Sequence, residues 1–475
     1  MRYLLLILCG LCGSSAAIEL PDIGASAGAI MSPQQEQQLG EAFVRQLRQH
    51  VDIIDDIQVN EYLNALGHRL ASYSNNPTQN FRFLPIKEVS INAFAVPGGF
   101  IGIHSGLILN TRTESELASV LAHEIAHVTQ HHIARSVETS QLLSLPTIAT
   151  IIAAIVAGAK NPQFGEAAVA AIMAGNIQMQ INFTRTHEKE ADRVGMQILA
   201  DAGFDPNDMP NFFERLQAAS RYYSNVPEFL RTHPVTTDRI AEARDRAEKF
   251  SKTQPSDTPL YHLMKAKLLV LTDDEPPRLL KKLQKMLKEG YYHDERATRY
   301  ALALTLLATR QTKGVQTQID WLLKNDGDRV IYHLLNAQLV LLQGNPTQAL
   351  QLYEQALQIY PGDYLLNLDY AEKLLQNKSA TKAKTVLLAL SPDDSNPDYY
   401  RLLAQAHQMT GAKTEAHLAL AENYYLIGKT QLAIEQLKQA LRQNDLNFYL
   451  ASRIEARLNE LREVLREERA SQPNG

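Results

Sequence analysis

The sequence predicts a mainly α-helical protein, in which a first region of helices plus a small β-sheet is followed by an α-solenoid of helical repeats. Three observations support this fold class. Apolar residues recur at helical spacing along most of the chain. One stretch, residues 81–109, is instead rich in β-branched and aromatic residues and is broken by a Pro-Gly-Gly turn signal. The last part of the chain repeats small residues with the period of stacked helix pairs.

The first seventeen residues have the pattern of a secretory signal peptide. Arg2 precedes a short apolar stretch, and small residues end at Ala17, where we expect cleavage. A transmembrane anchor is the alternative, but the apolar stretch is too short to span a bilayer. Both cysteines, Cys9 and Cys12, lie in this segment, so we expect a mature chain without disulfides or thiolate ligands. Export without disulfides suits the bacterial periplasm, and any metal must then bind His, Asp or Glu.

Length and charge restrict the class of protein further. The 475 residues are enough for several domains, and their formal net charge of −5, without a basic patch, argues against a nucleic-acid partner. Residues 251–260 lie in a segment rich in Ser, Thr, Pro and Lys, which is typical of a linker. We therefore expect one domain at 18–250 and a second at 261–475.

The region before the linker contains the predicted sheet between helices. Amphipathic patterns predict helices from about Ser32 to Asn75. Within residues 81–109, the Pro-Gly-Gly sequence at 97–99 predicts the turn of a small sheet. From Ser115 onward, helical patterns dominate.

The region after the linker carries the pattern of tetratricopeptide repeats. In "GNPTQALQLYEQALQIYPGD", Ala349 is followed by Tyr353, Ala356 and Pro361 at offsets of 4, 7 and 12, as in the helix pair of such a repeat. Ala383 lies 34 residues after Ala349, which is one repeat period. A second match, sharing the first two offsets, consists of Ala433, Leu437 and Ala440. We expect about four repeats of uneven quality, with a generic helical bundle as the alternative.

The stretch "LAHEIAHVTQHHIA" (residues 121–134) contains a metal-binding motif. His123, Glu124 and His127 fit H-E-x-x-H, and on a helix residues four apart differ by about 40° around the axis and about 6 Å along it. The two imidazoles can share one zinc ion at about 2.0–2.1 Å. Glu124 lies beside the ion and can take a proton from water. Upstream, Thr113 and Glu116 predict a capping box that starts this helix.

Two more histidines follow this motif. His131 lies about 12 Å along the helix axis from His123, too far to share its ion, and His132 points about 100° further round. We expect both to be surface residues or to support a ligand indirectly. The pair His127 and His131 also has ligand spacing, but Val128 stands where the base should be, so that pair could bind metal without catalysing a reaction.

A catalytic zinc ion needs a third protein ligand and an open position. In "RTHEKEADRVG" (residues 185–195), Glu188 and Asp192 are four apart and share a helix face. Glu188 can bind the ion, while Asp192 accepts a hydrogen bond from a bound imidazole and fixes its tautomer. We expect Glu190 and Arg193 to form a solvated pair. On spacing alone, a charged surface helix explains this pattern equally well.

The motifs together resemble those of the M48 family of zinc metallopeptidases. The family's third ligand is the glutamate of E-x-x-A-D, which matches residues 188–192, and its H-P followed by an arginine matches "HPVTTDR" at residues 233–239. The resemblance implies a zincin-type metalloprotease domain of helices plus a small β-sheet. It also implies one Zn2+ per chain, held by His123, His127 and Glu188.

His233 has two alternative roles under this resemblance. It can occupy the fourth zinc position in a resting enzyme and so exclude water. Alternatively, it can donate a hydrogen bond to the oxyanion of the reaction, with Arg239 beside it. The two roles could alternate if a loop moves.

The sequence "SINAFAVPGGF" also fits the family's pattern near the active site. An edge strand there would pair with an extended peptide and recognise its main chain with little sequence preference. Our candidates for this substrate-binding strand are Asn92, Ala93, Phe94 and Ala95.

An apolar segment separates the two ligand motifs. Residues 142–159 are eighteen residues without charge, long enough to raise the question of a membrane span, and a second apolar stretch follows at 167–175. Pro146 and many small residues weaken that interpretation. We favour a helical hairpin that covers the cleft or touches a membrane surface, and that gates access to the site.

Two classes of function remain open. The first is a zinc endopeptidase whose helical repeats recruit a substrate or partner. The resemblance implies that its substrates are unfolded or misassembled outer-membrane proteins, that its partner is the outer-membrane barrel-assembly machinery, and that the repeats act in a chaperone-like way. The second is mainly a chaperone or scaffold module with a latent protease site, which a fourth ligand at His233 and an apolar cover would favour.

Overall fold

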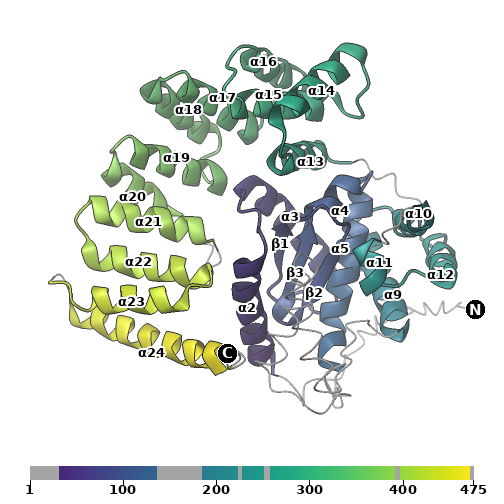
Figure 1. Cartoon of the computed structure of the whole chain (residues 1–475), viewed down its shortest axis with the longest axis horizontal. Helices are drawn as coiled ribbons and strands as arrows, with labels where there is room; N and C mark the ends of the chain where they lie inside the picture. The colour runs from purple at the N-terminus through teal and green to yellow at the C-terminus, as the bar shows by residue number, and fades with distance from the viewer. Residues whose placement is uncertain are drawn as a thin grey trace, which may run out of the picture.

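The computed structural model describes residues 32–135, 185–222, 227–250, 257–390, 396–444 and 446–470. The fold is mainly helical with one small sheet, as the sequence predicts. The elements before the repeats are α2 (Pro33–His50), α3 (Ile57–Ala71), β1 (Arg82–Ile86), β2 (Ala93–Val96), β3 (Phe100–His104), α4 (Ser105–Asn110), α5 (Glu114–Thr129), α9 (Arg185–Asp201), α10 (Asp208–Tyr222), α11 (Glu228–Thr232) and α12 (Thr237–Ala247). In Figure 1 these elements form one body, and the later helices curve around it until they come beside α2.

Two capped helices precede the sheet, within the span where the sequence predicts helices. The hydroxyl of Ser32 accepts a hydrogen bond from the amide of Gln35, whose side chain accepts one from the Ser32 amide, so a complete capping box starts α2. Asp56 caps α3 in the same way through one hydrogen bond. α3 then packs against β1 and α5, with Leu63 and Leu70 buried in the core.

The three strands form one mixed sheet in the order β1-β3-β2. The central strand β3 is parallel to β1 and antiparallel to β2, with Ile101 opposite both Phe83 and Ala95. β2 is therefore an edge strand. The predicted turn is a short 3-10 turn at residues 97–99, in which Gly98 and Gly99 have φ values of 79° and 82° that glycine adopts without strain.

The predicted strand-rich stretch ends earlier than the sequence indicates. Residues 105–110 form the helix α4, although we expected the sheet region to reach residue 109. Their apolar run is short and buried, and periodicity alone does not distinguish a buried strand from a buried helical turn.

α5 carries the H-E-x-x-H motif and is the buried centre of this region. Leu121 and Ile125 on this helix are fully enclosed. Thr113 caps the helix by accepting the amide of Glu116, as predicted. The Glu116 carboxylate, however, accepts from the amide of Arg112 and not from that of Thr113, so only half of the predicted capping box forms.

α9 packs against α5 at a short distance that a glycine makes possible. A Cβ atom on Gly195 would lie 3.0 Å from both the backbone N and the Cα of His123. Any larger residue would push the two helices apart at the first histidine of the motif. The backbone contact therefore sets how closely the E-x-x-A-D motif approaches the H-E-x-x-H motif.

The repeat region consists of consecutive packed helices. Ala349, Tyr353 and Ala356, the residues of the predicted repeat pattern, are buried on one face of α18. Twelve helices follow the linker in the described part of the chain, and the number of tetratricopeptide repeats among them stays a prediction. They are α13 (Pro259–Thr272), α14 (Pro276–Glu289), α15 (Glu295–Ala308), α16 (Val315–Asp326), α17 (Val330–Leu342), α18 (Pro346–Ile359), α19 (Tyr364–Gln376), α20 (Ala380–Ala389), α21 (Pro397–Met409), α22 (Lys413–Leu426), α23 (Thr430–Ala440) and α24 (Phe448–Ala470).

The first repeat helices share one apolar core with the sheet-containing region. A single cluster of buried side chains extends from Ile54 to Leu339 and includes Tyr261 of α13. A polar contact crosses at the same place, where Glu114 of α5 accepts hydrogen bonds from the backbone amide and hydroxyl of Thr258, at 3.0 and 2.8 Å. The first turn of α5 is thus hydrogen-bonded to the N-cap residue of α13.

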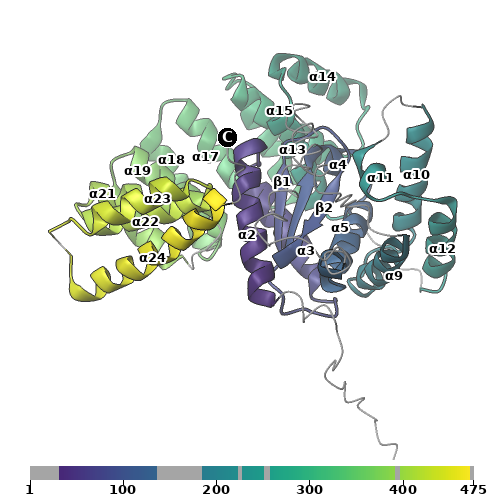
Figure 2. The same cartoon turned by 60° about the horizontal axis from the view of Figure 1, so that its bottom comes forward.

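The far end of the repeats contacts α2. Arg45 donates a hydrogen bond to the hydroxyl of Tyr425 on α22 at 3.0 Å, and its guanidinium lies over the same ring. Arg457 of α24 lies over this ring as well. Figure 2 shows α22 and α24 approaching α2 from the side opposite to α5 and α9. The repeat array therefore contacts the first region at both of its ends.

Three predicted features fall wholly or mostly outside the described residues. They are the signal peptide at 1–17, the apolar segment at 142–175, and the linker at 251–260, of which only the last four residues are described. Within the described part of the chain, no helix combines the length and apolar character needed to cross a membrane.

Candidate metal centre

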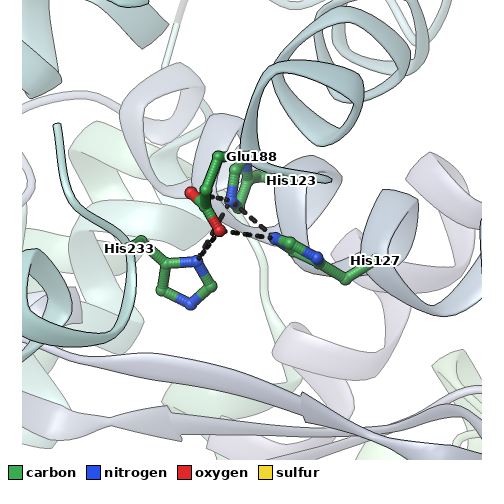
Figure 3. A group of neighbouring side chains, drawn as sticks. All are labelled: His123, His127, Glu188 and His233. Carbon is green, nitrogen blue, oxygen red and sulfur yellow. Dashed lines mark hydrogen bonds and ion pairs between the residues drawn. The ribbon is translucent and has the colours of Figure 1, made fainter. Parts of the chain in front are cut away.

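Four buried side chains from three segments meet beside α5. His123 and His127 come from α5, Glu188 from the first turn of α9, and His233 from the residue after α11. Their ligand atoms all lie within 4.8 Å of one another (Figure 3). The Nε2 atoms of His123 and His127 are 3.0 Å apart, and Nδ1 of His233 lies 3.4 Å from Nε2 of His123. The structure thus brings together the four residues that the sequence proposes as ligands.

The charges of this cluster suit a cation at its centre. The Glu188 carboxylate lies 3.0 Å from Nδ1 of His233 and 3.4 Å from Nε2 of His127. Burial raises the pKa of Glu188, but the surrounding imidazoles outweigh it and hold this pKa well below its usual range, so the carboxyl is ionised. Three imidazole nitrogens and one carboxylate, enclosed together, are a donor set that can hold a divalent metal ion.

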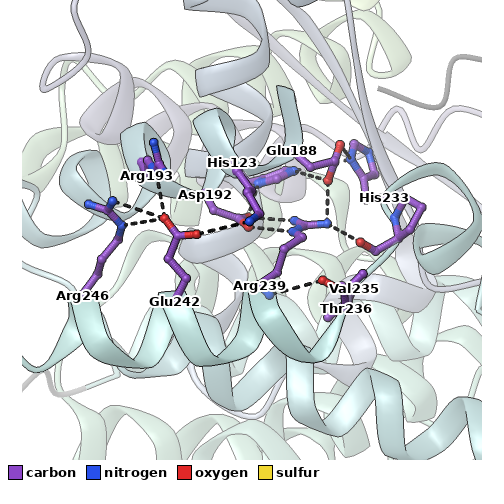
Figure 4. Close-up of polar contacts among 12 residues, drawn as sticks. His123, Glu188, Asp192, Arg193, His233, Val235, Thr236, Arg239, Glu242 and Arg246 are labelled. Carbon is purple, nitrogen blue, oxygen red and sulfur yellow. Dashed lines mark hydrogen bonds and ion pairs between the residues drawn. The ribbon is translucent and has the colours of Figure 1, made fainter. Parts of the chain in front are cut away.

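Asp192 and Arg239 support this cluster from behind (Figure 4). Nδ1 of His123 lies 3.1 Å from Oδ1 of Asp192. A carboxylate only accepts hydrogen bonds, so Nδ1 carries a proton and Nε2 is the nitrogen that faces the cluster. This is the contact that the four-residue spacing of Glu188 and Asp192 predicts. Burial raises the pKa of Asp192, but Arg239 and His123 outweigh burial and lower it.

Arg239 contacts the carboxylates behind the cluster and the backbone of Pro234, the residue after His233. Its guanidinium binds both carboxylate oxygens of Asp192 at 2.7 and 2.8 Å, Glu188 at 2.7 Å, and the backbone oxygen of Pro234 at 2.7 Å. All of its nitrogens are therefore engaged behind the cluster. This arrangement favours a positioning role for Arg239 over direct contact with an oxyanion beside His233.

Glu124, the candidate base, is fully buried on α5 beside the cluster. No described residue makes a hydrogen bond of normal geometry to either of its carboxylate oxygens, and Nε2 of His233 lies 3.5 Å from Oε1. Burial raises the pKa of Glu124, and the nearby His233 and His123 only partly offset this effect. A carboxylate with a raised pKa takes up a proton more readily, which suits a general base.

The position of His233 depends on residues that the sequence did not single out. Its ring stacks on that of Phe229 with 4.8 Å between centroids. The amide of Phe229 donates to the backbone oxygen of Ile91, and Ser90 donates to the Glu228 carboxylate at 3.1 Å. The segment just before β2 therefore holds α11, and α11 holds His233. A signal was present in the sequence, because Phe229 precedes His233 by one helical turn.

The two histidines after the motif are not on the motif helix. α5 ends at Thr129, and His131 has a φ of 52°, so the helical geometry used to place His131 and His132 does not apply. His131 is partly exposed and lies 3.2 Å from Glu36. His132 is fully buried, with its Nδ1 2.8 Å from Nδ1 of His127. Burial lowers the pKa of His132 to about 4.

The predicted solvated pair of Glu190 and Arg193 does not form. Glu190 instead contacts His132 at 3.2 Å and Arg135 at 3.0 Å, while Arg193 binds Glu242 of α12 at 2.8 Å. Both side chains point from α9 toward partners on different sides, which three-residue spacing alone does not reveal.

The predicted substrate-binding residues lie at the edge strand. Ala93, Phe94 and Ala95 belong to β2, and Asn92 immediately precedes it. β2 packs against α5, and among the described strands it pairs only with β3. The backbone of Ala95 is close enough to lower the pKa of Glu124, which places this strand beside the candidate base.

Comparisons with known proteins identify the family. Residues 58–247 match the sequence profile of "Peptidase family M48", and residues 340–406 match that of "Tetratricopeptide repeat". The chain is 37% identical over 453 residues to the putative beta-barrel assembly-enhancing protease of Vibrio cholerae, covering 94% of this chain and 92% of that protein. It is 35% identical to the beta-barrel assembly-enhancing protease of Escherichia coli, covering 95% and 93% of the two chains. The mitochondrial metalloendopeptidase OMA1 of Schizosaccharomyces pombe is 28% identical over 42% of this chain and 56% of its own length. The chain therefore belongs to peptidase family M48, as a metallopeptidase with tetratricopeptide repeats.

Proposed function

We propose that the protein is a periplasmic zinc endopeptidase that degrades misfolded or misassembled outer-membrane proteins and, through its repeats, assists their assembly. The observation that carries this proposal is the enclosed cluster of His123, His127, Glu188 and His233 with Glu124 beside it. The printed name of the relatives, beta-barrel assembly-enhancing protease, supports the substrate class. The predicted signal peptide supports the periplasmic location.

Zinc is the metal that the donor set favours. Four of the separations among Nε2 of His123, Nε2 of His127, Nδ1 of His233 and Oε1 of Glu188 lie between 3.0 and 3.4 Å, and the ligand atoms all lie within 4.8 Å of one another. The edge of a tetrahedron whose centre lies about 2.0–2.1 Å from each donor is about 3.4 Å. Three imidazole nitrogens and one carboxylate oxygen are also ligands that zinc prefers, whereas magnesium and calcium prefer oxygen ligands alone.

The proposed mechanism assigns each task to a named group. A zinc ion held by His123, His127 and Glu188 would supply Lewis-acid polarisation of the scissile carbonyl and of the attacking water. Glu124 takes the proton of that water and passes it to the leaving amine. β2 holds the substrate main chain in extended form beside Glu124. Asp192 and Arg239 keep His123 and Glu188 in place.

His233 supports the alternative function, a chaperone or scaffold module with a latent protease site. Its Nδ1 lies at hydrogen-bond distance from Glu188 and near His123, in the position of a fourth ligand. A zinc ion with four protein ligands has no open position for water, which would keep the enzyme at rest. Replacement of His233 by alanine separates the two roles: a latch predicts faster cleavage, and an oxyanion donor predicts slower cleavage.

The deciding experiment uses Glu124→Gln in the full mature chain. We expect this variant to retain zinc but to lose cleavage of a urea-unfolded outer-membrane protein, while Glu214→Gln, an exposed carboxylate on α10, cleaves at the wild-type rate. Persistent cleavage by Glu124→Gln would show that the mechanism is wrong.

The same variant tests the chaperone-like role in cells. Glu124→Gln expressed in place of the wild-type protein should support normal assembly of outer-membrane proteins if the repeats act independently of proteolysis. Copurification with the outer-membrane barrel-assembly machinery should also survive the substitution, and should be lost when the repeats are removed from α18 onward, which leaves the core up to Leu339 in place.

A further inference from the structure

The two histidines of the H-E-x-x-H motif are supported by different kinds of residue. The outward Nδ1 of His123 faces the Asp192 carboxylate. The outward Nδ1 of His127 faces another imidazole, with 2.8 Å between it and Nδ1 of His132. The other ring nitrogen of His132, Nε2, lies 3.2 Å from Oε2 of Glu190. Three side chains therefore form a line that leads from the metal cluster outward.

When a metal ion occupies the cluster, Nε2 of His127 directs its lone pair at the ion, and the hydrogen-bonding chemistry of this line then allows one arrangement of protons. An ionised carboxylate only accepts, so Nε2 of His132 donates to Glu190. In a neutral imidazole the other nitrogen then carries a lone pair, and Nδ1 of His132 accepts from Nδ1 of His127. His127 is left with its proton on Nδ1 and with the lone pair of Nε2 available to a metal ion in the cluster.

We infer that His132 and Glu190 are positioning residues that fix the tautomer and orientation of His127 as a metal ligand. This inference goes beyond the proposed function but rests on it, because it presumes that the cluster binds zinc. Such outer partners of ligating histidines raise ligand basicity and hold the ring in place.

The local backbone departs from the helix in a way that makes this contact possible. On a continued helix, His132 would lie about 140° around the axis from His127 and could not reach its ring. The end of α5 at Thr129 and the φ of 52° at His131 turn the chain back, so that the His132 ring lies 4.9 Å from that of His127.

Neighbouring groups hold the line in place. The ring of His187 stacks on that of His132, with 4.5 Å between centroids and 12° between planes. Arg135 binds the same Glu190 oxygen at 3.0 Å and so keeps the carboxylate ionised and oriented. His132 itself is fully buried, which removes competing water from its ring.

The outer partners of the two histidines also differ in charge, which predicts that His123 and His127 bind the metal ion with unequal strength. Asp192 is an anion in direct contact with His123. His127 instead contacts the neutral ring of His132, and the anion Glu190 lies on the far side of that ring. Loss of an outer partner of a zinc ligand typically costs about 10–100-fold in metal affinity. We therefore expect His132→Ala to weaken zinc binding by at least about tenfold.

The test measures zinc dissociation constants of the full mature chain by competition with a chromogenic chelator. His132→Asn retains an acceptor, its amide oxygen, near the position of Nδ1, and should recover most of the affinity lost in His132→Ala. His131→Asn is the matched control, because the neighbouring His131 contacts Glu36 and not the cluster, and it should bind zinc as the wild type does. Thermal midpoints of the metal-free variants report stability separately.

Defined outcomes decide the inference. Zinc affinity of His132→Ala within twofold of wild type, or His132→Asn binding no better than His132→Ala, overturns it. If His132→Ala does not fold, Glu190→Ala decides, because Glu190 is partly exposed and its removal opens no buried cavity: a loss of threefold or more supports the inference, and unchanged affinity overturns it. A wild-type chain that binds no zinc would instead contradict the proposed function.

Discussion

Replacement of Arg239 by methionine tests the polar arrangement behind the metal cluster. Methionine keeps much of the side-chain volume but removes the charge. Arg239 is only 3% exposed and makes four contacts of 2.7–2.8 Å, three of them with Asp192 and Glu188. The variant leaves two carboxylates, 6% and 1% exposed, without their shared cation. Removal of one partner from a buried ion pair costs about 3–5 kcal/mol, and we expect a loss of this size in the metal-free protein.

The pH dependence of this loss identifies its cause. In the wild type, Arg239 and His123 lower the pKa of Asp192 despite burial. A lowered folded pKa means that this carboxylate contributes stability above its unfolded pKa, near 3.9, and loses it as pH falls through the folded value. Without Arg239, burial dominates and the folded pKa rises above the unfolded one. The difference between wild type and variant should therefore shrink as pH falls from about 7 toward about 4.5.

Amide hydrogen exchange in α9 and α12 measures the free energy of local opening of these helices. Comparison of this free energy in the wild type and in Arg239→Met, at several pH values, tests the prediction. Arg244→Met is the matched control, because Arg244 lies on the same helix, α12, and binds Glu214 with both side chains more than 40% exposed. An exposed pair contributes at most about 1 kcal/mol, so the control should change little. A loss below about 1 kcal/mol for Arg239→Met, or a difference that grows as pH falls, would refute the reasoning.

Other consequences of the site geometry can be measured with the same protein. Burial lowers the pKa of His123, but hydrogen bonds to Asp192 and Glu188 outweigh it and raise this pKa to about 9 in the metal-free site. Zinc must then displace a proton from His123, so the zinc dissociation constant should fall about tenfold for each pH unit up to about pH 9. A dissociation constant that does not change with pH in chelator competition would contradict the role of His123 as a ligand. Asp192→Asn should weaken zinc binding about 10–100-fold, and an unchanged constant would exclude a role for its charge. Gly195→Ala places a methyl group 3.0 Å from the His123 backbone. Overpacking of this kind costs about 1–3 kcal/mol of stability, so the thermal midpoint should fall. In Gly362→Ala the added methyl group meets nothing within 4 Å, and the thermal midpoint should stay unchanged.

The parts of the site that the sequence predicts are those that depend on local spacing. His123 and His127 share a helix face because they are four residues apart, and Glu188 and Asp192 do so for the same reason. The strand–turn–strand pattern around residues 97–99 is equally local, since Pro and Gly restrict or widen the allowed backbone angles. These features need only the geometry of one element.

The parts that the sequence does not predict depend on contacts between elements. The end of α5 at Thr129 has no glycine or proline to mark it, and this end decides where His132 lies. Glu190 finds its partners on the segment after α5, and Arg239 finds Asp192 through the packing of α12 on α9. The parallel pairing of β1 with β3, two strands separated in the sequence by β2, is likewise a contact between elements that no spacing rule gives.

The contact of Glu114 with Thr258 bears on how the chain can be divided. A fragment that ends at residue 250 stops where the composition changes, but the packing continues beyond that point. Such a fragment would lose a hydrogen-bond partner of a buried carboxylate at the start of the motif helix, and would expose the apolar surface that Tyr261 and Leu263 cover. The buried cluster that contains Tyr261 continues to Leu339 of α17, so a fragment that keeps the whole core of the protease region has to include the helices from α13 to α17.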